Sequence, residues 1–195
     1  MSGFPPGPFD CILADPPWKF RTYGPHNNQK SPEKHYDTMT LEDIKAMPVA
    51  SLAARDCWLI MWTTWPCLPQ ALEVLDAWGF TYKSGGAWAK QTSTGRAWQF
   101  GTGYVFRSAS EPLIVASRGK PKWHSKSERN LWVAPVREHS RKPDCVHEMI
   151  ERACVGQKLE LFSRQTRPGW QSWGNQTDRF EAAARDGFKG VECLF

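Results

Sequence analysis

Short apolar runs alternate along the chain with stretches whose apolar residues recur at helical spacing. Runs typical of buried strands occupy residues 9–14, 57–62, 80–89, 112–116, 131–133 and 159–162. Helical patterns begin after Thr40 and at Pro48, and others cover 68–78, 143–153 and 177–185. Strands that alternate with helices predict an α/β fold, in which helices flank a mainly parallel sheet.

The ends of two elements carry recognisable signals. Thr40, with Asp43 three positions later, is a weaker form of the helix capping box, and Gly79 is a natural stop for the helix before it. In parallel sheets, ligands bind beyond the carboxyl ends of the strands. Asp15 and Arg164 each follow a predicted strand, so both are expected to lie at that edge.

Three segments lack these patterns. Residues 1–8 are rich in Pro and Gly and are expected to form a loose leader to a single domain over 9–195. Residues 21–38 are polar, and residues 91–103 are rich in Gly, Thr and Ser. Both are expected to form long loops, which in compact domains are often functional.

The composition is that of one globular domain. Of the 195 residues, 41% are hydrophobic and 23% are charged, which is too apolar for a disordered chain and sufficient for one core. No apolar run approaches the ~20 residues of a membrane span, and the first residues lack the pattern of a secretion signal. The six cysteines form no CxxC pair. Neither a metal site such as zinc nor a disulfide framework is therefore expected, and a reducing cytoplasm is the expected compartment.

Positive charge is concentrated in one segment. The net charge is +5, and the segment 118–142 holds eight basic and two acidic residues, a net +6. Trp123, His124 and Trp132 are interleaved with these charges, which suits a polyanion such as nucleic acid. A solvated loop that its lysines keep soluble explains the charge equally well.

The sharpest local pattern is the run Asp15-Pro16-Pro17-Trp18, directly after the first predicted strand. One interpretation of this run is purely structural, because Asp-Pro-Pro after a strand forms a rigid turn. Methylation of the N6 amine of adenine explains more of it. The Asp15 carboxylate and the Pro16 carbonyl can accept hydrogen bonds from the amine and aim its lone pair at an electrophile. The two prolines would hold these acceptors rigidly, and Trp18 would stack on a base taken out of its helix.

This run and several further blocks, in order, resemble the adenine-N6 methyltransferases with a DPPW motif, the MT-A-seventy family, and in particular its small bacterial and phage members. The resemblance extends from Phe9 to about Asp178. The blocks are ILADPPW at 12–18, KHYDTMTLEDI at 34–44, CWLIMW at 57–62, LEVLDAWGF at 72–80, GYVFRSASEPLIVASRGKP at 103–121, REHSRKPD at 137–144 and KLELFSRQTRPGWQSWGNQ at 158–176. So many separated blocks in one order make the match specific.

The resemblance implies a Rossmann-like, S-adenosylmethionine-dependent methyltransferase fold with permuted motif order, the catalytic motif preceding the cofactor motifs. That order accounts for the lack of a GxGxxG pattern. Asp15 would meet the target amine near the methionine end of the cofactor, Lys142 would bind the cofactor's carboxylate, and Glu160 would bind its ribose. From the residues alone, Lys142 is one more basic residue in a charged stretch, and Glu160 is a residue on a solvated strand face.

Further positions follow from the same resemblance. Arg164, Asn175 and Gln176 match cofactor-contacting positions. Thr166 and Arg167 fall in the loop over the cofactor, but their residue types differ from those of the eukaryotic messenger-RNA enzyme and they carry less weight.

The adenine pocket is expected to include Trp18, Tyr36 and Glu111. Tyr36 is equally well an ordinary loop aromatic. In the large eukaryotic enzyme a segment before the catalytic strand contacts the cofactor's adenine. Only 14 residues precede Asp15 here, so that contact is expected to be made differently or by a shorter loop.

The sequence therefore predicts an enzyme that transfers a methyl group from S-adenosylmethionine to N6 of adenine in nucleic acid, with DNA preferred over RNA. It is expected in the cytoplasm of a bacterial or phage-infected cell. The alternatives are a non-catalytic nucleic-acid-binding subunit of the same fold, an RNA adenine-N6 methyltransferase, and a cytosine-N4 methyltransferase. A homodimer or a partner subunit is left open.

Overall fold

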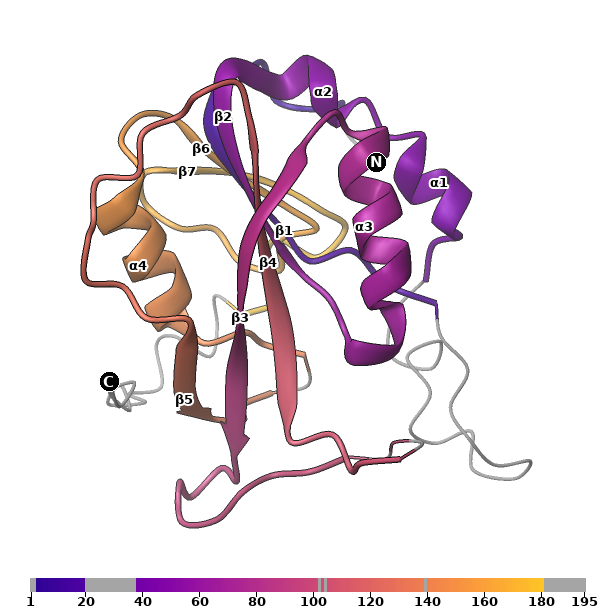
Figure 1. Cartoon of the computed structure of the whole chain (residues 1–195), viewed down its shortest axis with the longest axis vertical. Coiled ribbons are helices and arrows are strands. Elements are labelled where there is room, and N and C mark those ends of the chain that lie inside the picture. The colour runs from indigo at the N-terminus through magenta and orange to yellow at the C-terminus, as the bar shows by residue number, and fades with distance from the viewer. Residues whose placement is uncertain (1–2, 20–37, 102, 104, 139, 181–195) are drawn as a thin grey trace.

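A computed structural model describes residues 3–19, 38–101, 103, 105–138 and 140–180 (Figure 1). The strands are β1 (Phe9–Ala14), β2 (Ala53–Trp62), β3 (Thr81–Gln91), β4 (Ser110–Arg118), β5 (Leu131–Pro135), β6 (Lys158–Leu161) and β7 (Trp170–Trp173). The helices are α1 (Leu41–Lys45), α2 (Val49–Leu52), α3 (Leu68–Ala77) and α4 (Asp144–Ala153), with a 3₁₀ turn over Trp65–Cys67.

The seven strands form one sheet in the order β5-β3-β4-β2-β1-β6-β7. Every neighbouring pair is parallel except those that include β4, which runs antiparallel to both β2 and β3. The carboxyl ends of the six parallel strands therefore meet at one edge, together with the amino end of β4. We call this edge the catalytic edge below, because Asp15, which the sequence predicts to be catalytic, follows β1 there. The predicted α/β fold with a mainly parallel sheet is confirmed.

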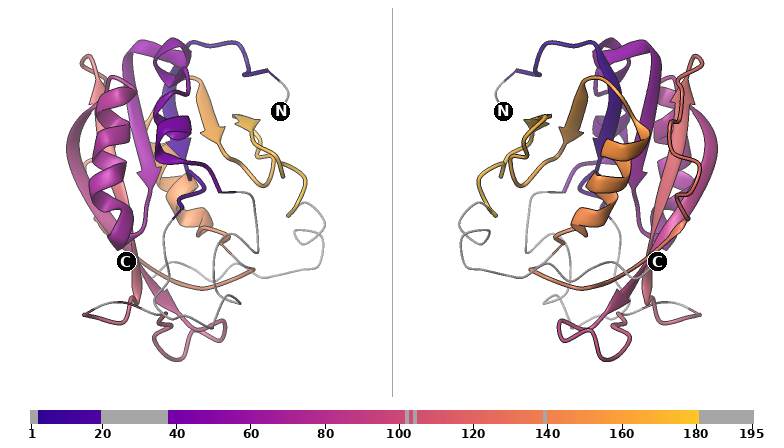
Figure 2. Two further views of the ribbon diagram at one scale, coloured as in Figure 1. Left: turned by 90° about the vertical axis from the view of Figure 1, so that its right-hand side faces the viewer. Right: turned by 90° about the vertical axis from the view of Figure 1, so that its left-hand side faces the viewer.

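Helices cover both faces of the sheet (Figures 1 and 2). One core cluster joins α1, α2 and α3 to the face that carries Ile12 and Ala14 of β1. The other joins α4 to the face that carries Cys11 and Leu13. Successive side chains of a strand point to opposite faces, so the continuous apolar run of β1 fills two cores at once. That burial anchors the strand that positions Asp15.

Most predicted elements are present, with shifted ends. The Thr40 hydroxyl accepts the Asp43 backbone N–H at 3.1 Å, as the capping pattern predicted, and Gly79 ends the α3 segment at φ 77°. The helix predicted from Pro48 stops at Leu52, because Ala53 already belongs to β2.

Two expectations near the chain ends were incomplete. The short strand β7 was not predicted, and Phe4, in the segment expected to be a loose leader, stacks on Trp173 with ring centroids 4.4 Å apart. The helix predicted over 177–185 is a turn over 177–180, and the rest of it lies outside the described residues.

The described residues show neither a membrane-spanning helix nor a cluster of potential metal ligands. None of the helices within the described ranges has the length and apolar character of a membrane span. The same residues contain no group of three or more potential metal ligands from His, Cys, Asp and Glu. Cys145 is disulfide-bonded. The cysteine spacing gave no reason to expect this bond, and neither did the expected reducing compartment.

Trp78 joins the two helices that cover one face. Its indole is fully buried at the end of α3, and its Nε1–H donates to the Ile44 carbonyl of α1 at 2.9 Å. Trp78→Phe removes this hydrogen bond and leaves unfilled volume, so the free energy of unfolding should fall by about 1–3 kcal/mol. Urea denaturation measures it. A change below about 0.5 kcal/mol would show that neither the bond nor the ring volume holds α1 on α3.

Candidate functional site

The Asp15–Trp18 segment is fixed at the catalytic edge by four hydrogen bonds, the first from the Asp15 backbone N–H to the Leu161 carbonyl at 3.4 Å. The Trp18 backbone N–H donates to the Pro16 carbonyl at 2.8 Å, and the Met39 N–H donates to the Pro17 carbonyl at 3.1 Å. The Trp18 indole Nε1–H donates to the Trp62 carbonyl at 3.0 Å. The turn that follows Asp15 is thus built from its own backbone and clamped to β2.

Trp18 does not offer an open ring in this structure. Its side chain is 5% exposed and belongs to the same core cluster as Ile12 and Met61. A ring buried to this extent presents no face on which a base can stack, so the geometry assigns Trp18 an anchoring role instead of the stacking role expected from the sequence. The Pro16 carbonyl already accepts one hydrogen bond, which leaves one lone pair for a substrate.

Four alternating charges continue inward from Asp15. Lys142 Nζ lies 2.8 Å from Asp15 Oδ2 and 2.8 Å from Glu111 Oε1, and Lys90 Nζ lies 2.5 Å from Glu111 Oε2. Lys90 comes from the end of β3, Glu111 from the start of β4, and Lys142 from the turn before α4. The Trp62 ring lies beneath the Lys142 ammonium, 5.7 Å away. Two lysines and two carboxylates balance one another at the catalytic edge.

Burial and these contacts determine the pKa of each group. Burial raises the pKa of Asp15, and Lys142 offsets only part of that effect. Burial also acts to raise the pKa of Glu111, but Lys142 and Lys90 outweigh it and lower the pKa to about 2. For Lys142, burial acts to lower the pKa, and Asp15 and Glu111 reverse this and raise it. Lys142 and Glu111 are therefore charged at neutral pH, and Asp15 is the stronger proton acceptor of the two carboxylates.

Two adjoining hollows open beside Asp15. The first is lined by Asp15, Pro17, Met39, Phe162, Ser163, Arg164, Trp173, Gly174, Asn175 and Gln176. The second is lined by Asp15, Trp62, Ser140, Arg141, Lys142, His147, Glu160, Phe162, Arg164, Gln165 and Phe180. Asp15, Phe162 and Arg164 line both, so the carboxylate lies where the two hollows meet.

The carboxyl end of β6 carries an unusual backbone that shapes both hollows. Phe162, between Glu160 and Arg164, has φ 63°, a conformation that costs a non-glycine residue energy and is concentrated at functional sites. The neighbouring turn needs Gly174, because a Cβ there would lie 2.4 Å from the Ser163 carbonyl oxygen. These two positions let the chain after β7 approach β6 closely.

The family model described as MT-A70 matches residues 9–176. The chain belongs to the MT-A70 family. It is 32% identical over 174 residues to an N(6)-adenosine-methyltransferase MT-A70-like protein of Arabidopsis thaliana, covering 87% of this chain and 24% of that protein. It is 30% identical over 177 residues to the human N(6)-adenosine-methyltransferase catalytic subunit METTL3, covering 88% of this chain and 29% of that one.

A relative of more similar length is also found. Type II methyltransferase M.MunI of a Mycoplasma species is 29% identical over 188 residues, covering 85% of this chain and 76% of its own length. The chain spans only about a quarter of the plant MT-A70-like proteins that it matches.

The structure brings most of the expected site residues of this MT-A70 chain together. Asp15, Lys142, Glu160, Arg164, Asn175 and Gln176 all line the two hollows. Glu111 adjoins them through Lys142. Thr166 is exposed, and Arg167 is paired with Asp144 of α4. Tyr36 lies outside the described residues.

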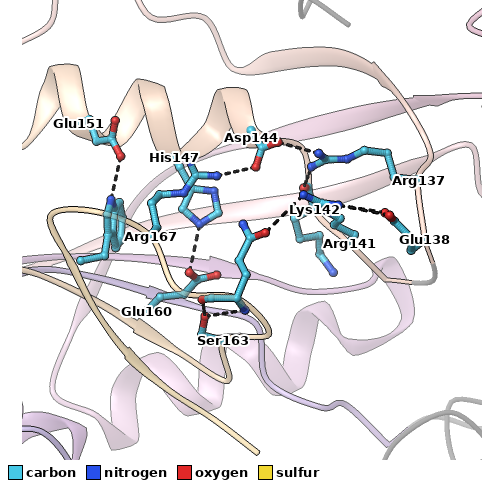
Figure 3. A network of polar contacts seen from close by, with 12 residues as sticks. Arg137, Glu138, Arg141, Lys142, Asp144, His147, Glu151, Glu160, Ser163 and Arg167 are labelled. Carbon is cyan, nitrogen blue, oxygen red and sulfur yellow. Dashed lines mark hydrogen bonds and ion pairs between the residues drawn. The ribbon is translucent and has the colours of Figure 1, made fainter. Parts of the chain in front are cut away.

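His147 is a site residue that the sequence reasoning missed. It is buried on α4, and its Nε2 lies 3.3 Å from Glu160 Oε2, without a well-formed hydrogen bond between them. Figure 3 shows the imidazole directed from α4 toward this carboxylate. Its position five residues after Lys142, on the inner side of a helix, was the available signal. Lys90, at the end of a predicted strand, was also missed.

The basic segment 118–142 does not form one surface. Its first part lies at the opposite edge of the sheet, where the Lys120 backbone N–H donates to Asp56 Oδ1 and the Lys122 carbonyl accepts the Trp58 indole N–H. Ala14, the residue before Asp15, pairs with Met61 of β2. Asp56 lies five residues before Met61, which places it roughly 15 Å along the strand from the catalytic edge. Figure 1 shows the chain leaving β4 at the opposite edge and descending beside α4.

The last part of the segment reaches the catalytic edge but is neutralised there. Arg137 pairs with Asp144 at 2.6 Å and Arg141 with Glu138 at 3.3 Å. Figure 3 shows both pairs beside Lys142. The concentration of charge in the sequence therefore does not become a continuous basic patch near Asp15.

Glu111 provides a test of the charge network. The ordinary pKa of 4.5 falls to about 2 in the folded chain, so its ion pairs stabilise the fold above about pH 4.5, and this stabilisation is lost as the pH falls toward 2. Glu111→Gln should lower the free energy of unfolding at pH 7 by about 3 kcal/mol. Urea denaturation between pH 7 and pH 3 should show the difference from wild type shrinking below about pH 4.5. A difference independent of pH would mean that Glu111 contributes packing and not charge.

Proposed function

We propose that this MT-A70 chain transfers a methyl group from S-adenosylmethionine to the N6 amine of adenine in nucleic acid, with DNA as the preferred polymer. The observation that carries the proposal is the position of Asp15. Its carboxylate lies at the junction of two hollows, one of which has room for a substrate amine beside it, while Lys142 contacts only its Oδ2.

The residues of the hollows suit this cofactor. Glu160 lines the second hollow, and its Oε2, which lies against His147, makes no well-formed hydrogen bond among the described residues, so the carboxylate is left to accept the ribose hydroxyls. Lys142, whose ammonium is charged at neutral pH, would hold the cofactor's carboxylate. Asn175 and Gln176 would contact the remaining polar groups from the turn after β7. When bound, S-adenosylmethionine supplies an electrophilic methyl group on a positively charged sulfur.

Glu160 is held from the side of α4. His147 lies against one of its oxygens, and the His147 ring packs edge-on against Trp170, with centroids 5.3 Å apart. We assign His147 the role of keeping the Glu160 carboxylate directed into the hollow.

Asp15 and Pro16 would act on the amine. The lone pair of N6 is delocalised into the adenine ring, so the nitrogen is a weak nucleophile. Hydrogen bonds from its two N–H groups to Asp15 Oδ1 and the Pro16 carbonyl would favour a pyramidal nitrogen with its lone pair directed away from the ring. The raised pKa of Asp15 suits it to receive the proton that the amine loses as the C–N bond forms.

The preference for DNA is supported by the bacterial relative. The matched region covers 76% of the type II methyltransferase M.MunI and 29% of the human N(6)-adenosine-methyltransferase subunit, so most of the bacterial protein, and only a part of the human one, corresponds to this chain. Labelled methyl transfer to matched DNA and RNA oligonucleotides, followed by nucleoside analysis, tests it. Efficient methylation of RNA with none of DNA would overturn the polymer assignment, and N4-methylcytosine would overturn the base.

Asp15→Ala should lower turnover at least ~100-fold, because it removes a positioned acceptor worth roughly 3 kcal/mol in the transition state. Methyl transfer under saturating cofactor and substrate measures this. Asp76→Ala, which removes an exposed carboxylate from α3, is the matched control and should be as active as wild type. Near-normal turnover of Asp15→Ala would place the active site elsewhere and favour a non-catalytic subunit.

Glu160→Ala should weaken cofactor binding. S-adenosylmethionine at ~100 times its dissociation constant should stabilise the wild-type chain by about 2.7 kcal/mol, and a tenfold loss of affinity reduces that gain to about 1.4 kcal/mol. Thermal unfolding with and without ligand measures the gain. Glu148→Ala, on the exposed side of α4, should keep the full gain. Lys142→Ala is a poorer test, because it also leaves two carboxylates without their shared cation.

A Glu160→Ala variant that unfolds early without ligand yet gains the full ligand shift would show that Glu160 is structural.

A further inference from the structure

Exposed aromatic rings gather on the connection between β3 and β4, residues 92–109. Trp98 is 57% exposed, Phe100 52% and Phe106 86%, with Val105 beside them at 86%. Figure 1 shows this connection extending beyond the catalytic edge, past the ends of the other strands. Side chains of this size are seldom left in water in such a group without a ligand or partner to cover them.

The connection is built as a ribbon whose backbone is hydrogen-bonded. The Thr92 N–H donates to the Ala97 carbonyl at 2.8 Å, the Gln99 N–H to the Lys90 carbonyl at 2.8 Å, and the Gly101 N–H to the Ser108 carbonyl at 2.9 Å. These bonds fix the backbone beside Trp98 and Phe100 relative to β3 and β4.

The charges of the connection favour an anionic occupant. Residues 92–109 include Arg96 and Arg107 and no acidic residue. The Arg107 guanidinium lies over the Phe100 ring, 4.6 Å from its centroid. Exposed rings on which bases can stack, together with cations that can meet phosphates, are the combination that binds single-stranded nucleic acid.

The ribbon leads to the proposed active site. Its two ends are Lys90 and Ser110–Glu111, and Lys90 and Glu111 belong to the charge network that reaches Asp15 through Lys142. A fourth exposed ring, Trp65 (47%), donates its Nε1–H to Ser110 Oγ at 3.0 Å. The rings thus continue from the tip of the ribbon toward the catalytic edge.

We infer that the β3–β4 ribbon holds an unpaired stretch of nucleic acid next to Asp15. Bases stack on Trp98, Phe100 and Phe106, and phosphates meet Arg96 and Arg107. The inference deepens the proposed function and rests on it for the meaning of the site. It also places the bound nucleic acid at the catalytic edge. The lysines of the 118–126 segment, which lie at the opposite edge, are then not its main contacts.

Binding of a fluorescently labelled, 12-nucleotide single-stranded DNA, followed by anisotropy, tests the rings. The combined variant Trp98→Ala, Phe100→Ala, Phe106→Ala should bind at least tenfold more weakly than wild type, with the same salt dependence, because it removes no charge. Tyr82→Ala removes a ring of similar exposure (50%) near the opposite end of β3 and should bind like wild type.

The arginines are tested by salt dependence. The double variant Arg96→Ala, Arg107→Ala should reduce the slope of log affinity against log salt by about 1.4, the value for two phosphate contacts on a single strand. The triple variant Lys120→Ala, Lys122→Ala, Lys126→Ala removes more charge from the opposite edge, and its slope should change less. A larger change in the lysine variant would place the phosphates at that edge and overturn the inference.

Unchanged DNA affinity in the aromatic variant would also overturn it. If, in addition, the wild-type chain sediments as a dimer and the aromatic variant as a monomer, the ribbon is a protein interface. Equal stabilisation of wild type and variant by S-adenosylmethionine should show that the variant is folded and its cofactor site intact.

Methyl transfer separates this inference from the proposed function. A wild-type chain that binds DNA through these rings but transfers no methyl group contradicts the proposed function and supports the inference that the ribbon binds nucleic acid. If the wild-type chain methylates DNA and the aromatic variant binds DNA as tightly, the proposed function is supported and the inference about the ribbon is overturned.

Discussion

The buried ammonium of Lys142 is the constraint on which the rest of the site depends. A cation taken out of water needs compensating charge, and Lys142 receives it from Asp15 after β1 and from Glu111 at the start of β4. Three segments far apart in sequence are thereby held at one edge of the sheet. The same contacts leave Asp15 with one oxygen committed and Glu111 with both, so the two carboxylates cannot exchange roles.

The fold was largely predictable because most of its information is local. The apolar runs of β1 and β2, the Thr40 cap and the Gly79 stop each act over a few residues. The direction of β4 was not predictable in this way, because a run such as 112–116 reads the same in a parallel or an antiparallel strand. β7 was missed because Trp170–Trp173 is only four residues long, with two polar residues between its two buried tryptophans, which does not show the period of two that predicts a strand.

The site was predictable in part for a different reason. Asp15, Lys142 and Glu160 are found through a motif order that the resemblance supplies, and the structure gathers them around two hollows. His147 and Lys90 act through contacts between residues far apart in sequence, which no pattern along the chain reports. The segment 118–142 shows the opposite error, because closeness in sequence suggested a single basic surface. In the structure the segment runs the length of the sheet, and Arg137, Arg141 and Lys142 at the catalytic edge are all paired with carboxylates.

The reversal of β4 has a consequence for how relatives of this chain could diverge. Because β3 and β4 form an antiparallel pair, their connection begins and ends at the same edge, and lengthening it adds only a modest loop-closure cost without moving any strand. Residues could be inserted or exchanged there while Glu111 and Lys90 stay in register across the pair. Under the proposed function, the hairpin is therefore the natural place for such a chain to acquire preference for particular neighbouring bases, while the charge network around Asp15 stays unchanged.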